Sequence, residues 1–231
     1  MSSRSMITDG FATAFKSKRL IYRAFENNEH DKNFLHQIEN DPVAAALSTP
    51  SKVRPRSTKS TEWVAESLSK SVLAVMVCLP PPGHSGAFSG EGEELSATRE
   101  PPTPIGYVVL GWAGADGPLD QSHHRTIGVG IALAAPYRDG GYGGEALDWA
   151  LDWAFRHGGY RRVELSTVAF NERALHLYRR LGFVEEGRRR QAHWHDRRWW
   201  DLVDFGMLED EWAARRGVSE EGEGGGGKAE I

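Results

Sequence analysis

The segment RDGGYGG, from Arg138 to Gly144, contains four glycines in seven residues and stands directly before an amphipathic stretch, EALDWALDWAFRHGG. The first N–H groups of a helix have no partner inside the helix, and the helix dipole adds partial positive charge there. Glycines let a ligand approach this backbone without a clash with Cβ atoms. The segment therefore predicts a site for a phosphate or pyrophosphate, to which Arg138 adds a charge-assisted hydrogen bond.

The glycine segment alone leaves alternatives open. It lacks the G-x-x-x-x-G-K-[ST] pattern of a P-loop and the G-x-G-x-x-G pattern of a dinucleotide-binding turn. The sequence also lacks the phosphate-binding lysine motif and the correctly placed metal-binding acids that a nucleotide-dependent kinase needs, so a kinase ranks low. A flexible turn before a weak helix start remains the purely structural interpretation.

A second segment, NERALHLYRRLGF at 171–183, follows about one helix and one strand later. Arg138-x-x-Gly141-x-Gly143-Gly144 resembles the [QR]-x-x-G-x-[GA] signature of the GNAT N-acetyltransferases. The second segment resembles that family's Asn-x-x-Ala-x-x-Leu-Tyr-x-x-x-Gly-Phe signature. The resemblance covers about 19–213. Within it, the segments RLIYRAFE, EEGRRR and WWDLVDFGMLEDEW resemble the ribosomal-protein-alanine and small-amine acetyltransferase subgroup of that family.

The resemblance implies an acetyl-CoA-dependent N-acetyltransferase. Acetyl-CoA is the expected co-substrate, and a primary amine of a protein N-terminus or a small molecule attacks it directly in a ternary complex. Tyr178 is the expected catalytic residue, because its phenol can donate to the leaving thiolate. The other residues implied to hold acetyl-CoA are Ala132, Leu133, Ala134, Arg138, Asp139, Gly140, Gly141, Tyr142, Gly143, Gly144 and Asn171. Asn171 is also a good helix N-cap.

The general base has no obvious candidate. Many members of the family carry a glutamate on the strand before the glycine signature, but TIGVGIALA at 126–134 contains no acid and no histidine. A base can act through water, come from elsewhere or be missing; Glu186, Asp201 and Asp204 are available to offset the charge of an amine. Because an α-amine is far more often neutral at pH ~7.5 than a lysine amine, the missing base favours an acceptor of low pKa. The rival hypothesis is a catalytically inactive CoA-binding sensor or interaction module.

The expected fold is α+β (a mixed α/β sheet) of GNAT type: a mostly antiparallel mixed sheet with splayed parallel strands, flanked by helices. Strands are expected at 20–25, 71–79, 105–114, 126–134 and 161–168, with two more between 183 and 208 that meet near His195-Asp196. One helical stretch, broken near Pro42 and anchored by Phe34, Ile38 and Val43 to Leu47, follows the first strand. The next helix has Ser60 or Thr61 as its cap and Trp63, Val64 and Leu68 on its apolar side. Two later helices run from Gly144 to Gly158 and from Asn171 to Gly182, and the apolar positions of the last one are 174, 177, 178 and 181.

Composition sets the wider limits. The 231 residues carry a net charge of −4 and one cysteine, Cys78, which argues against a nucleic-acid partner and excludes an intrachain disulfide. The predicted organisation is a flexible arm at 1–18, a catalytic domain at 19–213 with a loop insertion at 80–104, and a disordered acidic, Gly-rich tail at 214–231. We expect a monomer or homodimer in the cytoplasm, with the nucleus as the alternative, no membrane contact and no metal. His193 and His195 are a weak metal signal and more typical of a packed hairpin.

Overall fold

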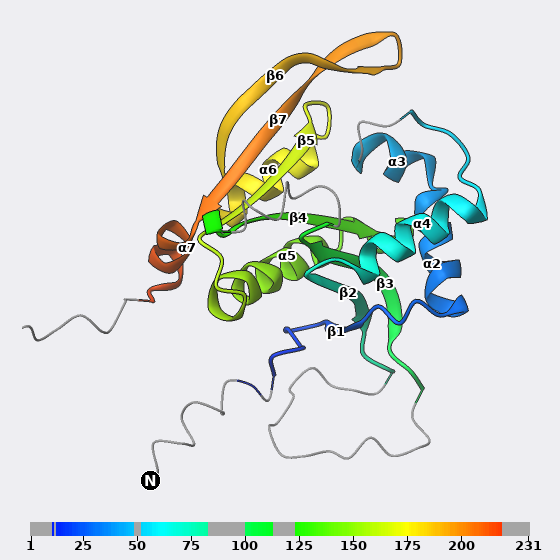
Figure 1. Ribbon diagram of the computed structural model, residues 1–231, viewed down its shortest axis with the longest axis horizontal. Coiled ribbons are helices and arrows are strands. Elements are labelled where there is room, and N and C mark those ends of the chain that lie inside the picture. The colour runs from blue at the N-terminus through cyan, green and yellow to red at the C-terminus, as the bar shows by residue number, and fades with distance from the viewer. Residues whose placement is uncertain (1–10, 12, 49–51, 83–99, 113–122, 219–231) are drawn as a thin grey trace, which may run out of the picture.

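A seven-stranded sheet runs through the computed structural model, which describes residues 11, 13–48, 52–82, 100–112 and 123–218 (Figure 1). The strand order is β1-β2-β3-β4-β5-β7-β6. Neighbouring strands are antiparallel except β4 and β5, which are parallel. This sheet and its flanking helices confirm the expected α+β fold.

The elements alternate along the chain as the hydrophobic pattern indicates. The strands are β1 (Ile21–Ala24), β2 (Leu73–Leu79), β3 (Thr103–Leu110), β4 (Thr126–Leu133), β5 (Arg162–Val168), β6 (Val184–His195) and β7 (Arg198–Leu208). The α-helices are α2 (Glu29–Glu39), α3 (Pro42–Ser48), α4 (Thr58–Ser69), α5 (Tyr142–Asp152), α6 (Glu172–Leu181) and α7 (Glu209–Arg216). A 3-10 turn, η2 (Ala135–Tyr137), follows β4, and a π-helical turn, η3 (Trp153–His157), extends α5.

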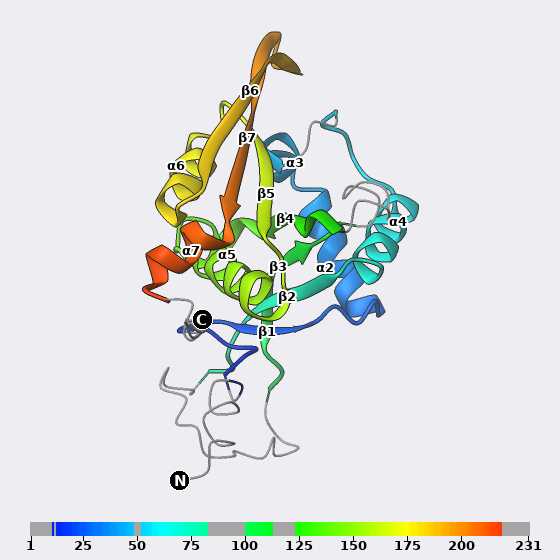
Figure 2. The same cartoon turned by 60° about the vertical axis from the view of Figure 1, so that its left-hand side comes forward.

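Helices cover both faces of the sheet (Figure 2). On one face α5 packs on the first four strands through buried apolar side chains such as Ala146, Trp149 and Ala150. On the other face α2 and α4 pack on β2 and β3 through side chains such as Leu35 and Leu68. Each buried Leu of this kind contributes about 1.5–3 kcal/mol of transfer free energy. The two layers therefore fix the central strands firmly.

The parallel pair separates along its length. β5 pairs with β4 only at Thr126, Ile127 and Gly128, whereas β3 pairs with β4 as far as Leu133. The rest of β5 stays paired with β7. One edge of β4, from Val129 onward, is therefore without a strand partner in the described sheet, and a backbone edge of this kind needs other hydrogen-bonding groups.

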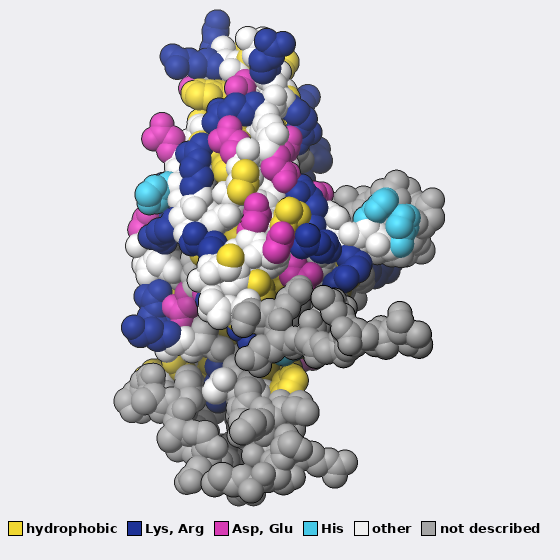
Figure 3. Space-filling view, turned by 90° about the vertical axis from the view of Figure 1, so that its left-hand side faces the viewer, with side chains coloured by type: hydrophobic (Ala, Val, Ile, Leu, Met, Phe, Trp, Pro, Cys, Tyr) yellow, Lys and Arg dark blue, Asp and Glu magenta, His cyan; other side chains and the backbone are white. Residues whose placement is uncertain are grey.

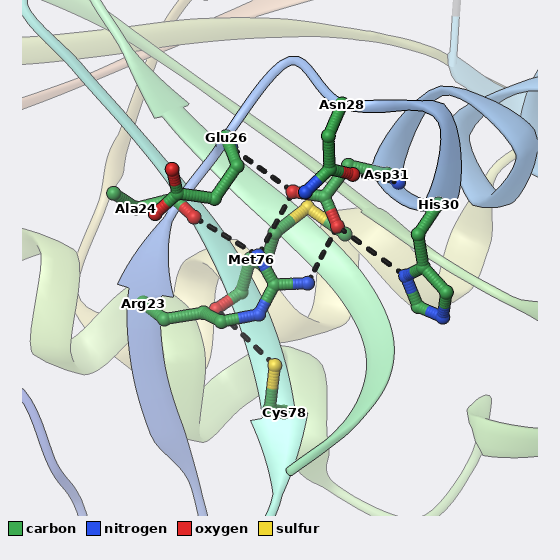
Figure 4. A network of polar contacts seen from close by, with 8 residues as sticks. All are labelled: Arg23, Ala24, Glu26, Asn28, His30, Asp31, Met76 and Cys78. Carbon is green, nitrogen blue, oxygen red and sulfur yellow. Dashed lines mark hydrogen bonds and ion pairs between the residues drawn. The ribbon is translucent and has the colours of Figure 1, made fainter. Parts of the chain in front are cut away.

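A buried ion pair joins β1 to α2 (Figure 4). The Arg23 guanidinium donates from Nη2 to Asp31 Oδ1 over 2.5 Å and from Nη1 to Oδ2 over 2.8 Å. Asp31 is fully buried and also accepts the backbone N–H of Glu26. Burial alone would raise the pKa of the Asp31 carboxyl, but Arg23, the Glu26 N–H and His30 together outweigh burial and lower this pKa. Removing one partner of such a pair typically costs 3–5 kcal/mol.

Several helix predictions need correction. The cap of α4 is Ser57, whose side chain accepts the Ser60 N–H, rather than Ser60 or Thr61. Trp63 and Val43 are exposed, so neither is a core anchor: α4 turns the face that carries Thr61, Val64 and Leu68 inward. The helix α7 was not expected after the last strand; its buried Trp212 packs on Phe155 of η3.

The remaining organisation is described in part. Residues 83–99 of the expected insertion and 219–231 of the expected tail lie outside the described residues, and Thr103 and Pro104 belong to β3. Of the expected N-terminal arm, Ala14 accepts a hydrogen bond from the Trp149 indole, and Ser17 donates to Glu145. The described part of this segment therefore lies against α5.

Candidate active site

A cavity of about 470 Å³ opens where β4 and β5 separate. Its walls are β4, β5, the glycine segment with the start of α5, one face of α6, and α3. Of the residues expected to hold acetyl-CoA or to act in catalysis, the cavity is lined by Ala132, Leu133, Arg138, Asp139, Gly143, Gly144, Asn171 and Tyr178. The fold therefore brings both signature segments to one cleft.

Four of the residues expected to hold acetyl-CoA do not line the cavity: Ala134, Gly140, Gly141 and Tyr142. Gly141 is the N-cap of α5 with φ 78°, in the left-handed region, which glycine adopts without strain. The carbonyl of Gly140 accepts Arg19 Nη1 over 2.9 Å, and the Arg19 guanidinium lies 4.5 Å from the Tyr142 ring centre. Sequence reasoning missed this contact of Arg19, although the residue begins the RLIYRAFE segment. Ala134 lines no part of the cavity; its N–H donates to Ile105.

Gly143 and Gly144 present bare backbone to the cavity. A Cβ built on Gly143 would meet its nearest atom, Leu133 Cδ1, at 3.6 Å, which is ordinary contact distance. Packing within the protein therefore does not require glycine there, although glycine in a helix costs roughly 0.5–1 kcal/mol relative to alanine. The first-turn N–H groups of α5 point out of the helix end. The site thus fits an anion that approaches the backbone closely.

Arg138 is engaged by the protein. Its Nε donates to the Leu133 carbonyl over 3.1 Å, and its Nη2 donates to Asp41 Oδ2. Asp41 also accepts the N–H groups of Val43 and Ala44 at the start of α3. Burial would raise the pKa of the Asp41 carboxyl, but the hydrogen bonds from Ala44 and Arg138 outweigh burial and lower it. Arg138 therefore connects the end of β4 to α3, and its charge is shared with Asp41.

The helix α6 supplies the opposite wall. Asn171 caps it by accepting the Ala174 N–H over 3.2 Å and donates from its Nδ2 to the Leu47 carbonyl of α3, so the capping prediction is confirmed. Of the apolar positions expected on this helix, Ala174, Leu177 and Tyr178 line the cavity, and Leu175 is the buried residue of the helix.

Basic side chains along α6 face the same cavity: Arg173, His176 and Arg180. Sequence reasoning missed them, although with Leu177 they repeat at helical spacing and so share one face. One of them is partly neutralised, because Arg173 pairs with Asp139 over 2.7 Å at an exposed position. The wall near the start of α5 is therefore cationic.

Tyr178 lies deep in the cleft. Its ring packs edge-on against Phe183 and Phe205, with ring centres 6.0 and 5.7 Å away. No hydrogen bond joins its hydroxyl to another residue in the described part of the chain. Burial raises the pKa of Tyr178 to about 12. The phenol thus stays protonated near neutral pH and can donate a hydrogen bond.

A second cavity of about 340 Å³ lies on the face of the sheet that carries Gly128 and Gly130. It shares Val129, Gly130, Leu165 and Ser166 with the first cavity. Ser166 is the polar side chain among these shared residues. The two cavities therefore meet at the separation of β4 and β5.

Carboxylates from three strands line the second cavity: Glu164, Glu186 and Asp204. Glu186 is paired with Arg162, which lowers the pKa of this carboxyl. Asp204 accepts Ser166 Oγ over 2.5 Å and Arg189 Nη2 over 3.1 Å. Of the acids considered from the sequence, Glu186 and Asp204 thus reach the cavity, and Asp201 does not.

His193 and His195 line neither cavity. His195 stacks on Phe170 with ring centres 5.0 Å apart, and burial, with the nearby His195, lowers the pKa of His193. Trp194 and Trp199 of the same hairpin are exposed. Across the described ranges, no group of three or more His, Cys, Asp or Glu side chains gathers as a metal site.

Comparison with known proteins agrees with this geometry. Residues 83–183 match the model of the acetyltransferase (GNAT) family. The uncharacterized prophage-derived N-acetyltransferase YokL of Bacillus subtilis is 29% identical over 92 residues, 40% of this chain and 52% of that protein. The spermidine N(1)-acetyltransferase of Vibrio cholerae is 27% identical over 92 residues, 40% of this chain and 53% of that protein. The matched segment therefore spans about half the length of these curated relatives.

The similarity in fold is more extensive. The crystal structure of the Vibrio cholerae spermidine N-acetyltransferase in complex with CoA and spermine has a TM-score of 0.63 at 19% identity, covering 85% of this chain and 99% of that one. The fold is therefore similar to that of this acetyltransferase over most of the chain. In sequence, residues 83–183 are similar to the GNAT acetyltransferase family.

Proposed function

We propose that this protein transfers the acetyl group of acetyl-CoA to a primary amine by direct attack in a ternary complex. The observation that carries the proposal is the meeting of the two cavities at Val129, Gly130, Leu165 and Ser166. A thioester in the first cavity and an amine in the second can meet there without either leaving its own side of the sheet.

Acetyl-CoA fits the first cavity as the co-substrate. The first-turn N–H groups at Gly143 and Gly144 would hold the pyrophosphate, and the basic face of α6 adds positive charge. The free edge of β4 from Val129 onward would pair with the amide groups of the pantetheine arm. Tyr178 would donate to the sulfur. Since the pKa of Tyr178 is about 12 and that of a free thiol is about 8.5, Tyr178 stabilises the leaving thiolate by a hydrogen bond rather than by full proton transfer.

The expected acceptor is a positively charged amine, because carboxylates line the second cavity. Around the second cavity the carboxylates of Glu164, Glu186 and Asp204 outnumber the guanidinium groups of Arg162 and Arg189, so a cationic amine is attracted there. Polyamines suit this charge, and spermidine is the substrate named for the Vibrio cholerae relative. Peptide N-termini remain the second class to test.

On the face drawn in Figure 3, acidic and basic side chains alternate below a basic cluster at the end of the β6–β7 hairpin. None of the helices in the described part is long and apolar enough to span a bilayer. A cytoplasmic monomer or homodimer belongs to the same proposal. One spermidine acetyltransferase structure from Vibrio cholerae is dodecameric, so the oligomeric state should be measured by light scattering.

The test is a CoA-release assay with polyamines, peptides and amino sugars, run beside calorimetric titration with acetyl-CoA. Acetyl-CoA binding with turnover on at least one amine is expected. Binding without turnover across the panel would favour the inactive CoA-binding module, and absence of binding would reject both.

A further inference from the structure

We propose that Ser166 and Asp204 together take the proton from the acceptor amine. This inference rests on the proposed acetyl transfer and names the base that the sequence does not reveal. The strand that often carries a glutamate in this family has Gly128 and Gly130 on the cavity-facing side. The neighbouring strands β5 and β7 supply Ser166 and Asp204 to the space that these glycines leave open.

The geometry selects this pair from the other polar groups of the cavity. Ser166 is the polar side chain that lines both cavities, so it lies beside the point where the amine and the thioester meet. Its Oγ donates to Asp204 Oδ1 over 2.5 Å, because the two residues are register partners on β5 and β7. Glu186 and Asp204 are each paired with an arginine, but Asp204 also accepts Ser166 Oγ and so connects to the junction of the two cavities.

The charged groups around Asp204 orient its carboxylate and leave it exposed enough to accept a proton and pass it to solvent. Arg189 donates to both of its carboxylate oxygens, over 3.1 and 3.2 Å, and fixes the carboxylate plane. Arg162 is engaged by Glu186 and Glu164. The Asp204 side chain is 36% exposed, so a proton that it accepts can pass on to solvent.

The proton balance is simple. The ammonium form of the acceptor first gives one proton to Ser166 Oγ, whose own proton moves to Asp204 and from there to solvent. The neutral amine nitrogen then forms the C–N bond with the thioester carbonyl carbon and gives up its second proton by the same route. The C–S bond breaks, the electron pair leaves on sulfur under the hydrogen bond from Tyr178, and the thiolate takes its proton from water. Asp204 returns its proton to solvent, and no further reactant is needed.

The test compares Asp204→Asn and Ser166→Ala with a matched control, Glu185→Gln. Glu185 of β6 pairs with Arg179 of α6 and with Arg188 of β6, and it lines neither cavity. We expect kcat to fall about 100-fold or more in Asp204→Asn and to fall also in Ser166→Ala, with acetyl-CoA affinity unchanged. The loss should shrink for amines of low pKa, whose protonated adducts lose a proton to water more easily. Glu185→Gln should stay within about twofold of the wild type.

Three outcomes are informative. A rise in acceptor KM with kcat unchanged would show that Asp204 only attracts the cation, and would overturn the proposal. Wild-type kcat in both Asp204→Asn and Ser166→Ala would overturn it as well, while leaving acetyl transfer intact. A wild-type protein that acetylates no amine would overturn both proposals. Circular dichroism of each variant, with Ser166→Ala as the mild exposed change, separates lost chemistry from lost folding.

Discussion

The substitution Gly143→Ala should make the protein more stable and weaken its binding of acetyl-CoA. Gly143 is in the first turn of α5, and its backbone φ is not in the left-handed region. The added methyl group would have Leu133 Cδ1 at 3.6 Å and Ile131 Cδ1 at 3.9 Å as its nearest neighbours. The fold can therefore accept it without movement.

The expected changes in stability and in acetyl-CoA affinity can be given magnitudes. Replacing glycine by alanine at a compatible position stabilises a protein by about 0.4–1 kcal/mol, which corresponds to about 1–4 °C in Tm for a chain of this size. The methyl group stands in the cavity where the anion should meet the backbone. Losing one hydrogen bond to a charged group costs about 1.5–3 kcal/mol, so the dissociation constant should rise roughly 10- to 150-fold.

Two measurements decide the matter: Tm by differential scanning fluorimetry without ligand, and the Kd of acetyl-CoA by calorimetry. The control is Gly141→Ala, where φ is 78° and a Cβ is strained, so Tm should fall in that variant. An unchanged Kd in Gly143→Ala would refute the backbone cradle. A lower Tm would refute the claim that packing has room for the methyl group.

The remaining predictions address the catalytic phenol, the arginine of the signature and the buried ion pair. Tyr178→Phe should lower kcat about 10- to 100-fold without raising the Kd of acetyl-CoA, because its hydroxyl serves the leaving group; wild-type kcat would reject that role. Asp41→Asn keeps an oxygen that can cap α3 but frees Arg138, so acetyl-CoA should bind about 2- to 10-fold more tightly; weaker binding would show instead that Asp41 positions the arginine. The pKa of Asp31 is lowered in the fold, so its contribution to stability is present above its unfolded pKa and is lost as pH falls below about 4. In urea titrations at pH 7 and pH 3, Asp31→Asn should lose several kcal/mol at pH 7 and less at pH 3; equal losses would contradict the linkage to Arg23.

The segments that line the first cavity could be predicted from the sequence because their signals are local, and their role in holding acetyl-CoA stays a prediction. A helix start and an Asn cap are properties of a few consecutive residues, and Asn171 caps α6 as expected. The helix α5 begins at Tyr142, after the N-cap Gly141, rather than at the expected Gly144. The sheet order is non-local, yet the family signatures imply its open parallel pair. The errors fall where one helix has two apolar sides: Trp63 looked like a core residue, but α4 turns another face to the sheet.

The use of Arg138 could not be inferred from its motif. Its position predicts a pyrophosphate contact, but its partners are Asp41, nearly a hundred residues earlier, and the Leu133 carbonyl. In the same fold, Asn171 donates to the Leu47 carbonyl at the other end of α3. Both signature segments therefore hold α3, whose Ala44 and Leu47 line the cavity. A ligand that draws Arg138 away from Asp41 must also disturb α3.

The acceptor side shows why the base was missed. The search for a base on β4 found TIGVGIALA without an acid, and that absence favoured an acceptor of low pKa. In the fold, the glycines of β4 open a space that β5, β6 and β7 fill with Glu164, Glu186 and Asp204. These residues are up to 40 positions apart in the chain, and only strand register places Ser166 opposite Asp204. Under the proposed Ser166–Asp204 base, amines of high pKa, polyamines included, are acceptors that the site would deprotonate. The low-pKa acceptor stays the prediction that follows from β4 alone, and the two predictions differ in which amines the protein acetylates.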